Sequence, residues 1–128
     1  MRQFITIVEN MKSTPYSFGE RLGECSFDGV VYHCSPERFD QFRLDPERGV
    51  YFSNEPDSDY GEFVYECRVR LNYAIAELSE DVQSPFKRDY VDYDGRIVDY
   101  SNEADYEMYD VIAFDLKSIR ILSVTEKS

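Results

Sequence analysis

The chain has 128 residues, enough for one domain with a hydrophobic core but too few for two. Its eleven Tyr and nine Phe argue against intrinsic disorder over most of the length. The formal net charge of -12 argues against direct binding to nucleic acid or to an anionic membrane, because both require clustered Lys and Arg.

The sequence gives no sign of export or of a metal site. No apolar stretch is long enough to cross a bilayer, and no basic start leads into an apolar signal segment. Cys25, Cys34 and Cys67 are an odd number without paired spacing, which is typical of thiols in the cytosol. A zinc site built from His33 and these cysteines would lack the usual C-x-x-C pair. We therefore expect a soluble cytoplasmic protein without a metal.

The first third of the chain predicts a helix and two strands. Residues 2–11 carry apolar side chains at helical spacing, and residues 12–28 read as an irregular connection. A buried strand is expected over residues 29–34, and Ser35 followed by Pro36 is a helix-start signal. Residues 1–28 would thus form an N-terminal helix and connection, ahead of a core over residues 29–128 in a single domain.

The remaining chain predicts mainly strands. Gly49 opens a short strand, and residues 63–71 alternate between apolar and mostly charged side chains, which indicates a strand with one buried face. Further strands are expected at residues 97–98, 110–114 and 119–124. A helix followed by many short strands predicts a compact α+β fold, with mainly antiparallel strands and few short helices.

Three residue types suited to one chemistry occur at the ends or centres of these strands. His33, the only histidine, ends the first strand and can hydrogen-bond a ribose hydroxyl. Tyr51, in the next strand, and Tyr60, after it, offer flat faces to a cationic ring. Asp110, at the start of a late strand, can stabilise positive charge that develops in a transition state. Each residue alone also fits a structural role, so only their ordered combination favours a site.

These blocks resemble the ADP-ribosyltransferases of the His-Tyr-acid type, the diphtheria-toxin and PARP-like class. In that family a strand ends in His followed by Gly and then Ser or Thr, here His33-Cys34-Ser35. The next strand has the form Gly-apolar-Tyr-Phe-small, matched by residues 49–53. Residues 110–115 are similar to the last family block and put Asp110 at the position of the acid. The Asp-Gly turn within residues 93–97 is similar to one in small phage-encoded members.

The resemblance, which runs from Val31 onward, implies an ADP-ribosyltransferase-like fold that uses NAD as substrate without a metal. It implies Asp110, His33 and Tyr51 as catalytic residues. The implied NAD-binding residues are His33, Cys34, Ser35, Tyr51, Phe52, Ser53 and Tyr60. Two departures concern Cys34, which replaces the usual glycine, and Asp110, which is one methylene shorter than Glu. Glu107 is therefore an alternative catalytic acid.

The implied activity is mono-ADP-ribosylation, in which NAD is cleaved and its ADP-ribose passes to a protein. Asp57, Asp59 and Glu62 stand beside the proposed pocket in the sequence and would steer the enzyme toward a basic or nucleic-acid-binding protein. By family analogy, such a chain is a phage or mobile-element effector that disables host machinery, such as a CRISPR complex or a polymerase, in the host cytosol. NAD hydrolysis in place of transfer is compatible with the same residues.

Three other functions belong to different classes. A non-catalytic acidic protein on the same fold could mimic nucleic acid and block its binding groove. Transfer of an RNA 2′-phosphate to NAD requires basic residues for RNA, and the chain has no basic stretch. A cysteine–histidine hydrolase built on Cys34 or Cys67 has no recognisable nucleophile motif. Binding of NAD separates the leading prediction from the nucleic-acid mimic.

Overall fold

The structure is a computed structural model that describes residues 14–20, 22–56 and 61–127. The helix expected over residues 2–11 lies outside these ranges, as do Tyr60, Asp57 and Asp59. The described strands are β1 (Gly23–Ser35), β2 (Val50–Ser53), β3 (Phe63–Leu78), β4 (Gly95–Asp99), β5 (Tyr109–Ala113) and β6 (Ile119–Glu126). Three short 3-10 helices accompany them: η1 (Ser79–Asp81), η2 (Lys87–Tyr90) and η3 (Leu116–Ser118).

The expectation of an α+β fold is wrong. The structure is a mixed sheet of six strands, and within the described ranges its helical residues are confined to the three 3-10 helices. The helix expected to begin at Pro36 is absent. Ser35 is instead the last residue of β1, and its Oγ accepts a hydrogen bond from the Glu37 amide at 3.1 Å, which turns the chain. Phe39 and Phe42 pack on each other and on Tyr65 from a loop, rather than from one face of a helix.

Two strands are much longer than the sequence pattern predicts. β1 begins at Gly23, so the residues expected to connect the helix to the core are part of the sheet. β3 continues through residues 72–78, where the buried positions shift to Ala74 and Ala76 at an irregularity in the pairing with β1. The strands expected at residues 97–98, 110–114 and 119–124 are confirmed as β4, β5 and β6.

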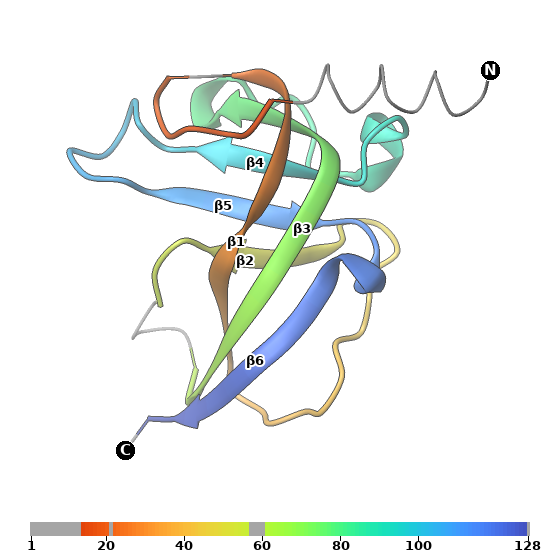
Figure 1. Ribbon diagram of the computed structural model, residues 1–128, viewed down its shortest axis with the longest axis vertical. Helices are drawn as coiled ribbons and strands as arrows, with labels where there is room; N and C mark the ends of the chain where they lie inside the picture. The colour runs from red at the N-terminus through yellow and green to blue at the C-terminus, as the bar shows by residue number, and fades with distance from the viewer. Residues whose placement is uncertain (1–13, 21, 57–60, 128) are drawn as a thin grey trace.

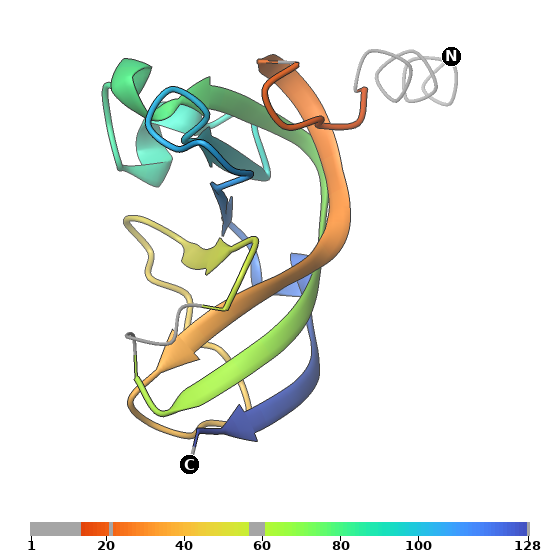
Figure 2. The same ribbon diagram turned by 90° about the vertical axis from the view of Figure 1, so that its left-hand side faces the viewer.

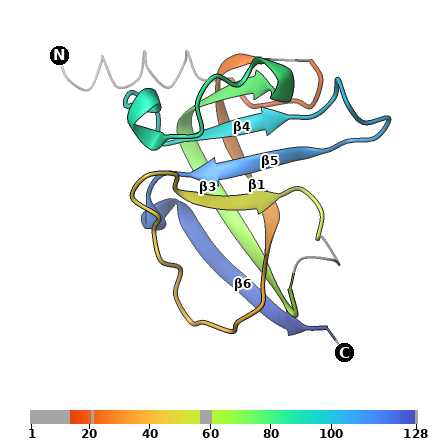
Figure 3. The same ribbon diagram turned by 180° about the vertical axis from the view of Figure 1, so that it is seen from behind.

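The strand pairings close on themselves. β3 pairs antiparallel with β1 and β6 and parallel with β4; β4 pairs with β5, and β5 with β2. β2 then returns to β1 through the single register pair Tyr32–Ser53. In Figure 1 the long strands β1 and β3 cross in front of β2, β4 and β5, which lie nearest the viewer in Figure 3. In the side view, β1, β3 and β6 form one curved layer, with β2 on the opposite side (Figure 2).

The main core lies between these two groups of strands. Val31, Phe52, Tyr65, Ile97 and Val111 are each at most 2% exposed, and burial of such side chains is the main source of stability in a sheet of this size. A smaller cluster of Tyr90, Val98, Ile112 and Phe114 covers the outer face of β4 and β5. In the part of the chain that the structure describes, no helix has the length and apolarity required to span a membrane.

A buried carboxylate fixes the segment before β1 to the end of β4. Asp99 is 0% exposed, and its Oδ2 accepts hydrogen bonds from the Tyr16 hydroxyl at 2.5 Å and from the Gly19 amide at 3.1 Å. Its Oδ1 accepts one from the Ser101 amide at 2.8 Å. Burial by itself raises the pKa of Asp99, but these hydrogen bonds outweigh it and hold the pKa below its ordinary value. Asp99 is therefore a structural carboxylate.

Candidate functional site

A pocket that includes most of the predicted site residues lies where β1 and β2 separate. Because these strands share only one register pair, the sheet opens there into a pocket with a volume of about 660 Å³, a size common among small-molecule sites. The residues around it come from β1, β2, the loop after β2 and the start of β5: Tyr32, His33, Cys34, Tyr51, Phe52, Ser53, Asn54, Glu55, Pro56, Tyr106, Glu107, Met108 and Asp110.

His33 is held at the split between the two strands. Its Nδ1 lies 2.7 Å from the carbonyl oxygen of Tyr51, and a carbonyl only accepts, so Nδ1 carries the proton. In the neutral ring Nε2 is then an acceptor. The ring packs edge-on against Phe42, with centroids 5.0 Å apart, and against Phe52 at 5.9 Å. These contacts fix the orientation of a ring that also lines the pocket.

The Tyr51 ring lies on the face of β2 that points away from the core. Strand alternation buries Val50 and Phe52 in the core, and it leaves Tyr51 37% exposed. The Tyr51 hydroxyl accepts a hydrogen bond from Nη2 of the buried Arg96 at 3.1 Å. The ring is therefore anchored at its hydroxyl end while part of its surface stays open to a ligand.

Asp110 is on the same sheet face as Tyr51. On β5 it lies opposite Ser53 of β2 and Val98 of β4, and it is half-buried. Its Oδ2 accepts a hydrogen bond from the Tyr100 hydroxyl at 3.1 Å. Burial raises the pKa of Asp110 above its ordinary value, although the Tyr100 hydrogen bond and the charge of Arg96 oppose the rise. A carboxylate in such a setting interacts strongly with nearby positive charge.

The donor to Asp110 stays protonated across the physiological range. Burial and the neighbouring Asp110 carboxylate raise the pKa of Tyr100 to about 12. The Tyr100–Asp110 hydrogen bond therefore persists wherever Asp110 is ionised.

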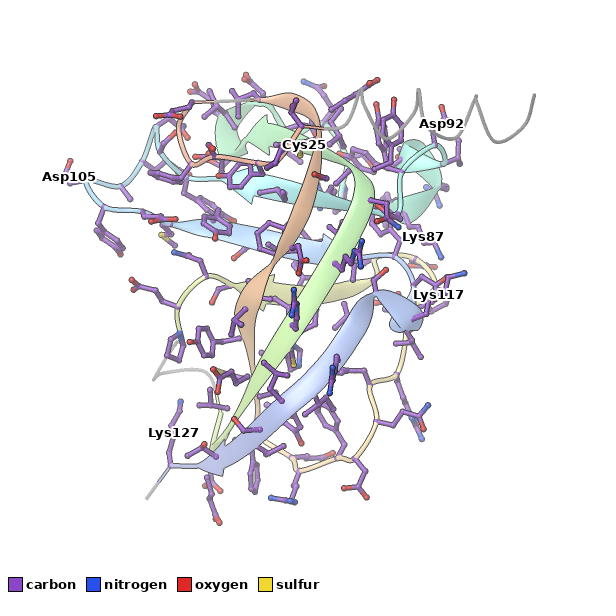
Figure 4. The ribbon with its side chains drawn as sticks, viewed as in Figure 1. Cys25, Lys87, Asp92, Asp105, Lys117 and Lys127 are labelled. Atoms are coloured by element: carbon purple, nitrogen blue, oxygen red, sulfur yellow. The ribbon has the colours of Figure 1, made fainter. Side chains whose placement is uncertain are left out.

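The alternative acid, Glu107, has a different environment. It lines the same pocket, but its side chain is exposed on the loop between β4 and β5. Asn54 fixes this part of the rim: its Nδ2 donates to the Glu107 carbonyl at 3.1 Å, and its Oδ1 accepts from the Tyr109 amide at 3.0 Å. Asp105, at the tip of the same loop, projects away from the body of the protein (Figure 4). Solvent screens such exposed charges, so Asp110 is the better placed carboxylate for electrostatic stabilisation.

The structure brings most of the predicted site residues together. His33, Cys34, Tyr51, Phe52, Ser53 and Asp110 all line the pocket. Phe52 is 2% exposed, so its side chain belongs chiefly to the core. Ser35 is not among the lining residues; it is buried, and its hydroxyl is used by the turn after β1. Tyr60 is outside the described residues.

Sequence reasoning missed three polar residues that organise the site: Arg96, Tyr100 and Asn54. Arg96 had a detectable signal, since it is a single basic residue within the short apolar strand that contains Ile97 and Val98. Tyr100 and Asn54 are near neither the histidine nor the acid in sequence. Their roles follow from strand pairing over long sequence separations, which no local pattern reports.

Two of the three cysteines are buried in the core, and the third lines the pocket. Cys67 is fully buried, and burial raises the pKa of its thiol to about 12, so it stays protonated. Cys25 is also fully buried. Cys34 lines the pocket beside His33, but the His33 Nδ1 is engaged by the Tyr51 carbonyl.

No protein family, curated protein or solved structure matches the chain. The side chains around the pocket, and their order in the sequence, are therefore the basis for proposing a function.

Proposed function

We propose that this protein is a mono-ADP-ribosyltransferase that binds NAD in the pocket between β1 and β2 and transfers ADP-ribose to another protein. The observation that carries the proposal is the meeting of His33, Tyr51 and Asp110, from β1, β2 and β5, around that one pocket. These are the three residues that the sequence pattern singles out for this chemistry. His33 and Asp110 are 77 positions apart in the sequence, so the fold, and not closeness along the chain, brings them together.

The reaction requires a negative charge close to the ribose. The bond between C1′ of the ribose and the nicotinamide nitrogen breaks, and its electron pair neutralises the nicotinamide ring. Positive charge develops on C1′ until the lone pair of an acceptor group forms the new bond and that group loses its proton. Asp110 supplies the carboxylate, and its half-buried position makes the attraction stronger than it would be in water.

His33 and Tyr51 bind rather than react. The Nε2 of His33 accepts a hydrogen bond from a ribose hydroxyl, with the ring held in place through Nδ1. The Tyr51 ring stacks on the nicotinamide, whose positive charge favours contact with an aromatic face. Together they orient the scissile bond toward Asp110, and such orientation is itself a large part of catalysis.

The acceptor is a basic protein. Glu103, Asp105 and Glu107 are exposed on the loop that borders the pocket, and the whole chain carries a net charge of -12. Complementary charge speeds the encounter with a positively charged partner and suppresses binding to acidic ones. In line with the resemblance to small phage-encoded enzymes, we place the activity in a host cytoplasm and among effectors that disable nucleic-acid-handling machinery.

Calorimetric titration with NAD tests the proposal and its alternative. Wild type should release or absorb heat with a 1:1 stoichiometry, and Tyr51→Ala should lose at least tenfold in affinity. Tyr93→Ala is the matched control, because Tyr93 is also a partly exposed tyrosine but lies in a different hollow. No heat with wild type would favour the non-catalytic acidic mimic. Equal affinities in Tyr51→Ala and wild type would move NAD out of this pocket.

A further inference from the structure

Arg96 is a buried cation without a carboxylate partner. It is 3% exposed, and among the described residues it forms no ion pair and its Nε has no hydrogen-bond partner. Its other nitrogens donate to neutral oxygens: Nη2 to the Tyr51 hydroxyl at 3.1 Å, and Nη1 to the Ser84 carbonyl at 3.3 Å and the Tyr90 hydroxyl at 3.4 Å. The guanidinium also lies 5.0 Å from the centre of the Tyr90 ring.

The stability of the folded protein does not by itself explain why Arg96 is buried without a carboxylate partner among the described residues. Burial of a charge is costly unless it is well paired, and neutral replacements of similar volume often leave stability unchanged or increase it. The acceptors of Arg96 also have other partners. The Tyr90 hydroxyl has two acceptors within reach of its one proton, the Ser84 carbonyl at 2.8 Å and Glu77 Oε1 at 3.1 Å. Tyr51 is exposed enough for water to reach it. Removal of the guanidinium would therefore leave few unsatisfied groups.

The strand register places Arg96 close to two residues of the candidate pocket. In the sheet, Arg96 of β4 lies opposite Ile112 of β5, which lies opposite Tyr51 of β2. Asp110 is the next residue on that same face of β5. Arg96 thus lies on the same sheet face as Tyr51 and Asp110. Burial raises the pKa of Asp110 above its ordinary value, and the positive charge of Arg96 partly opposes that rise.

We propose that Arg96 is a positioning residue of the pocket. Its guanidinium holds the Tyr51 hydroxyl through a hydrogen bond, and its positive charge stabilises the Asp110 carboxylate. Its meaning for catalysis rests on the proposed function. Its effect on Asp110 does not, because the titration of Asp110 can be measured without NAD.

The direction of the effect on Asp110 follows from all the groups around it. Tyr100, after β4, donates to the carboxylate and is neutral. Tyr51 of β2 and His33 of β1 line the same pocket, and Glu55 and Glu107 at its rim carry the same charge as Asp110. Glu77 of β3 is engaged by Tyr90. Among these groups Arg96 is therefore the one that carries a fixed positive charge, and its loss must raise the pKa of Asp110.

Carbon-13 NMR titration of the Asp110 carboxyl tests the proposal directly, with the signal assigned by its absence in Asp110→Asn. In Arg96→Met the midpoint should rise by about one pH unit, a tenfold change in the acid constant, as expected for loss of a nearby opposite charge. Arg96→Lys should restore most of the wild-type midpoint. Arg120→Met is the control, because Arg120 is exposed on β6, away from the pocket.

Two further measurements keep the proposal falsifiable. Arg96→Met should melt at or above the wild-type temperature; if it fails to fold, the same titration is made on Arg96→Gln, which is neutral but can still donate to Tyr51. Tyr51→Phe should weaken NAD binding while leaving the Asp110 midpoint in place. An unchanged midpoint in folded Arg96→Met or Arg96→Gln overturns the proposal. If the midpoint moves but wild type neither binds nor cleaves NAD, the proposed function fails and the role of Arg96 in the pocket stands.

Discussion

The Tyr100 hydroxyl donates a hydrogen bond to Asp110 Oδ2 at 3.1 Å, across the hairpin that joins β4 to β5. Its neighbour in sequence, Asp99, accepts hydrogen bonds from the segment before β1. Asp99 is the last residue of β4 and Tyr100 directly follows it, yet their side chains serve different parts of the protein. Asp99 anchors the segment before β1, and Tyr100 donates a hydrogen bond to the carboxylate in the candidate pocket.

Tyr100→Phe should shift the pH dependence of NAD cleavage. The hydrogen bond from Tyr100 lowers the pKa of Asp110, so its removal raises that pKa and the enzyme needs a higher pH to keep Asp110 ionised. A hydrogen bond to a charged group is worth about 1.5–3 kcal/mol, so the acid limb of the rate profile should move up by about one pH unit or more. Tyr106→Phe, at an exposed tyrosine of the same pocket, is the control, and equal profiles for all three proteins would contradict the role of Tyr100.

Asp110→Asn should raise the melting temperature at pH 7. The folded-state pKa of Asp110 lies above its unfolded value, so the folded protein binds the proton more tightly and loses stability as pH rises through the window between the two pKa values. Asparagine keeps the shape without the charge and removes that loss. The difference should vanish at a pH below the unfolded pKa, about 3.9. A lower melting temperature than wild type at pH 7 would show that Asp110 is stabilising.

Asp99→Ala should destabilise the protein by about 2–4 kcal/mol, because the Tyr16 hydroxyl and two backbone amides lose a buried acceptor. The folded pKa of Asp99 is below its unfolded value, so its contribution is present at neutral pH and is lost as pH falls through the folded pKa. Urea denaturation at pH 7 and at acidic pH measures both effects. Asp105→Ala, at the loop tip, should change neither, and a loss below 1 kcal/mol in Asp99→Ala would refute the anchoring role.

His33→Phe should separate packing from binding. A phenyl ring can keep the edge contacts with Phe42 and Phe52 but has no nitrogen for the Tyr51 carbonyl or for a ribose. Loss of the Tyr51 hydrogen bond should cost about 1 kcal/mol of stability, whereas NAD affinity should fall at least tenfold. His33→Ala should be less stable than His33→Phe, since it also removes the ring contacts. Normal NAD affinity in a folded His33→Phe would exclude His33 from the binding site.

Local patterns predicted the later strands better than they predicted the fold class. The alternation in residues 63–71 marked this part of β3 because every second residue from Tyr65 to Leu71 is buried. The helix at Pro36 was wrong because Phe39 and Phe42 bind to the end of β1 from a loop, and Tyr65 exchanges hydrogen bonds with the Phe39 backbone. The start of β1 at Gly23 could not be predicted, because residues 23–28 mix polar and apolar side chains. These residues form a strand by pairing with β3, which is far away in the sequence.

The candidate site shows the same division. His33, Tyr51 and Asp110 could be named from strand ends and a family-like pattern, because those features are local. Tyr100 could not, and Arg96 carried only the signal of a lone basic residue in a short apolar strand, because the contacts of both depend on β4 lying beside β5, and β5 beside β2. From the sequence Asp110 was the preferred acid and Glu107 the alternative. In the structure Asp110 is half-buried and accepts a hydrogen bond from Tyr100, whereas Glu107 is exposed.

The central claim is that Asp110 supports cleavage of NAD, and a paired mutant assay with radiolabelled NAD and a host-cell lysate tests it most directly. Wild type should label a host protein and release nicotinamide. Asp110→Asn should bind NAD normally by calorimetry but turn it over on the order of a hundredfold more slowly, as for loss of one electrostatic contact made in the transition state. Glu107→Gln, the matched control from the same pocket, should stay close to wild type. Full activity in Asp110→Asn, or loss of activity in Glu107→Gln alone, would contradict the account.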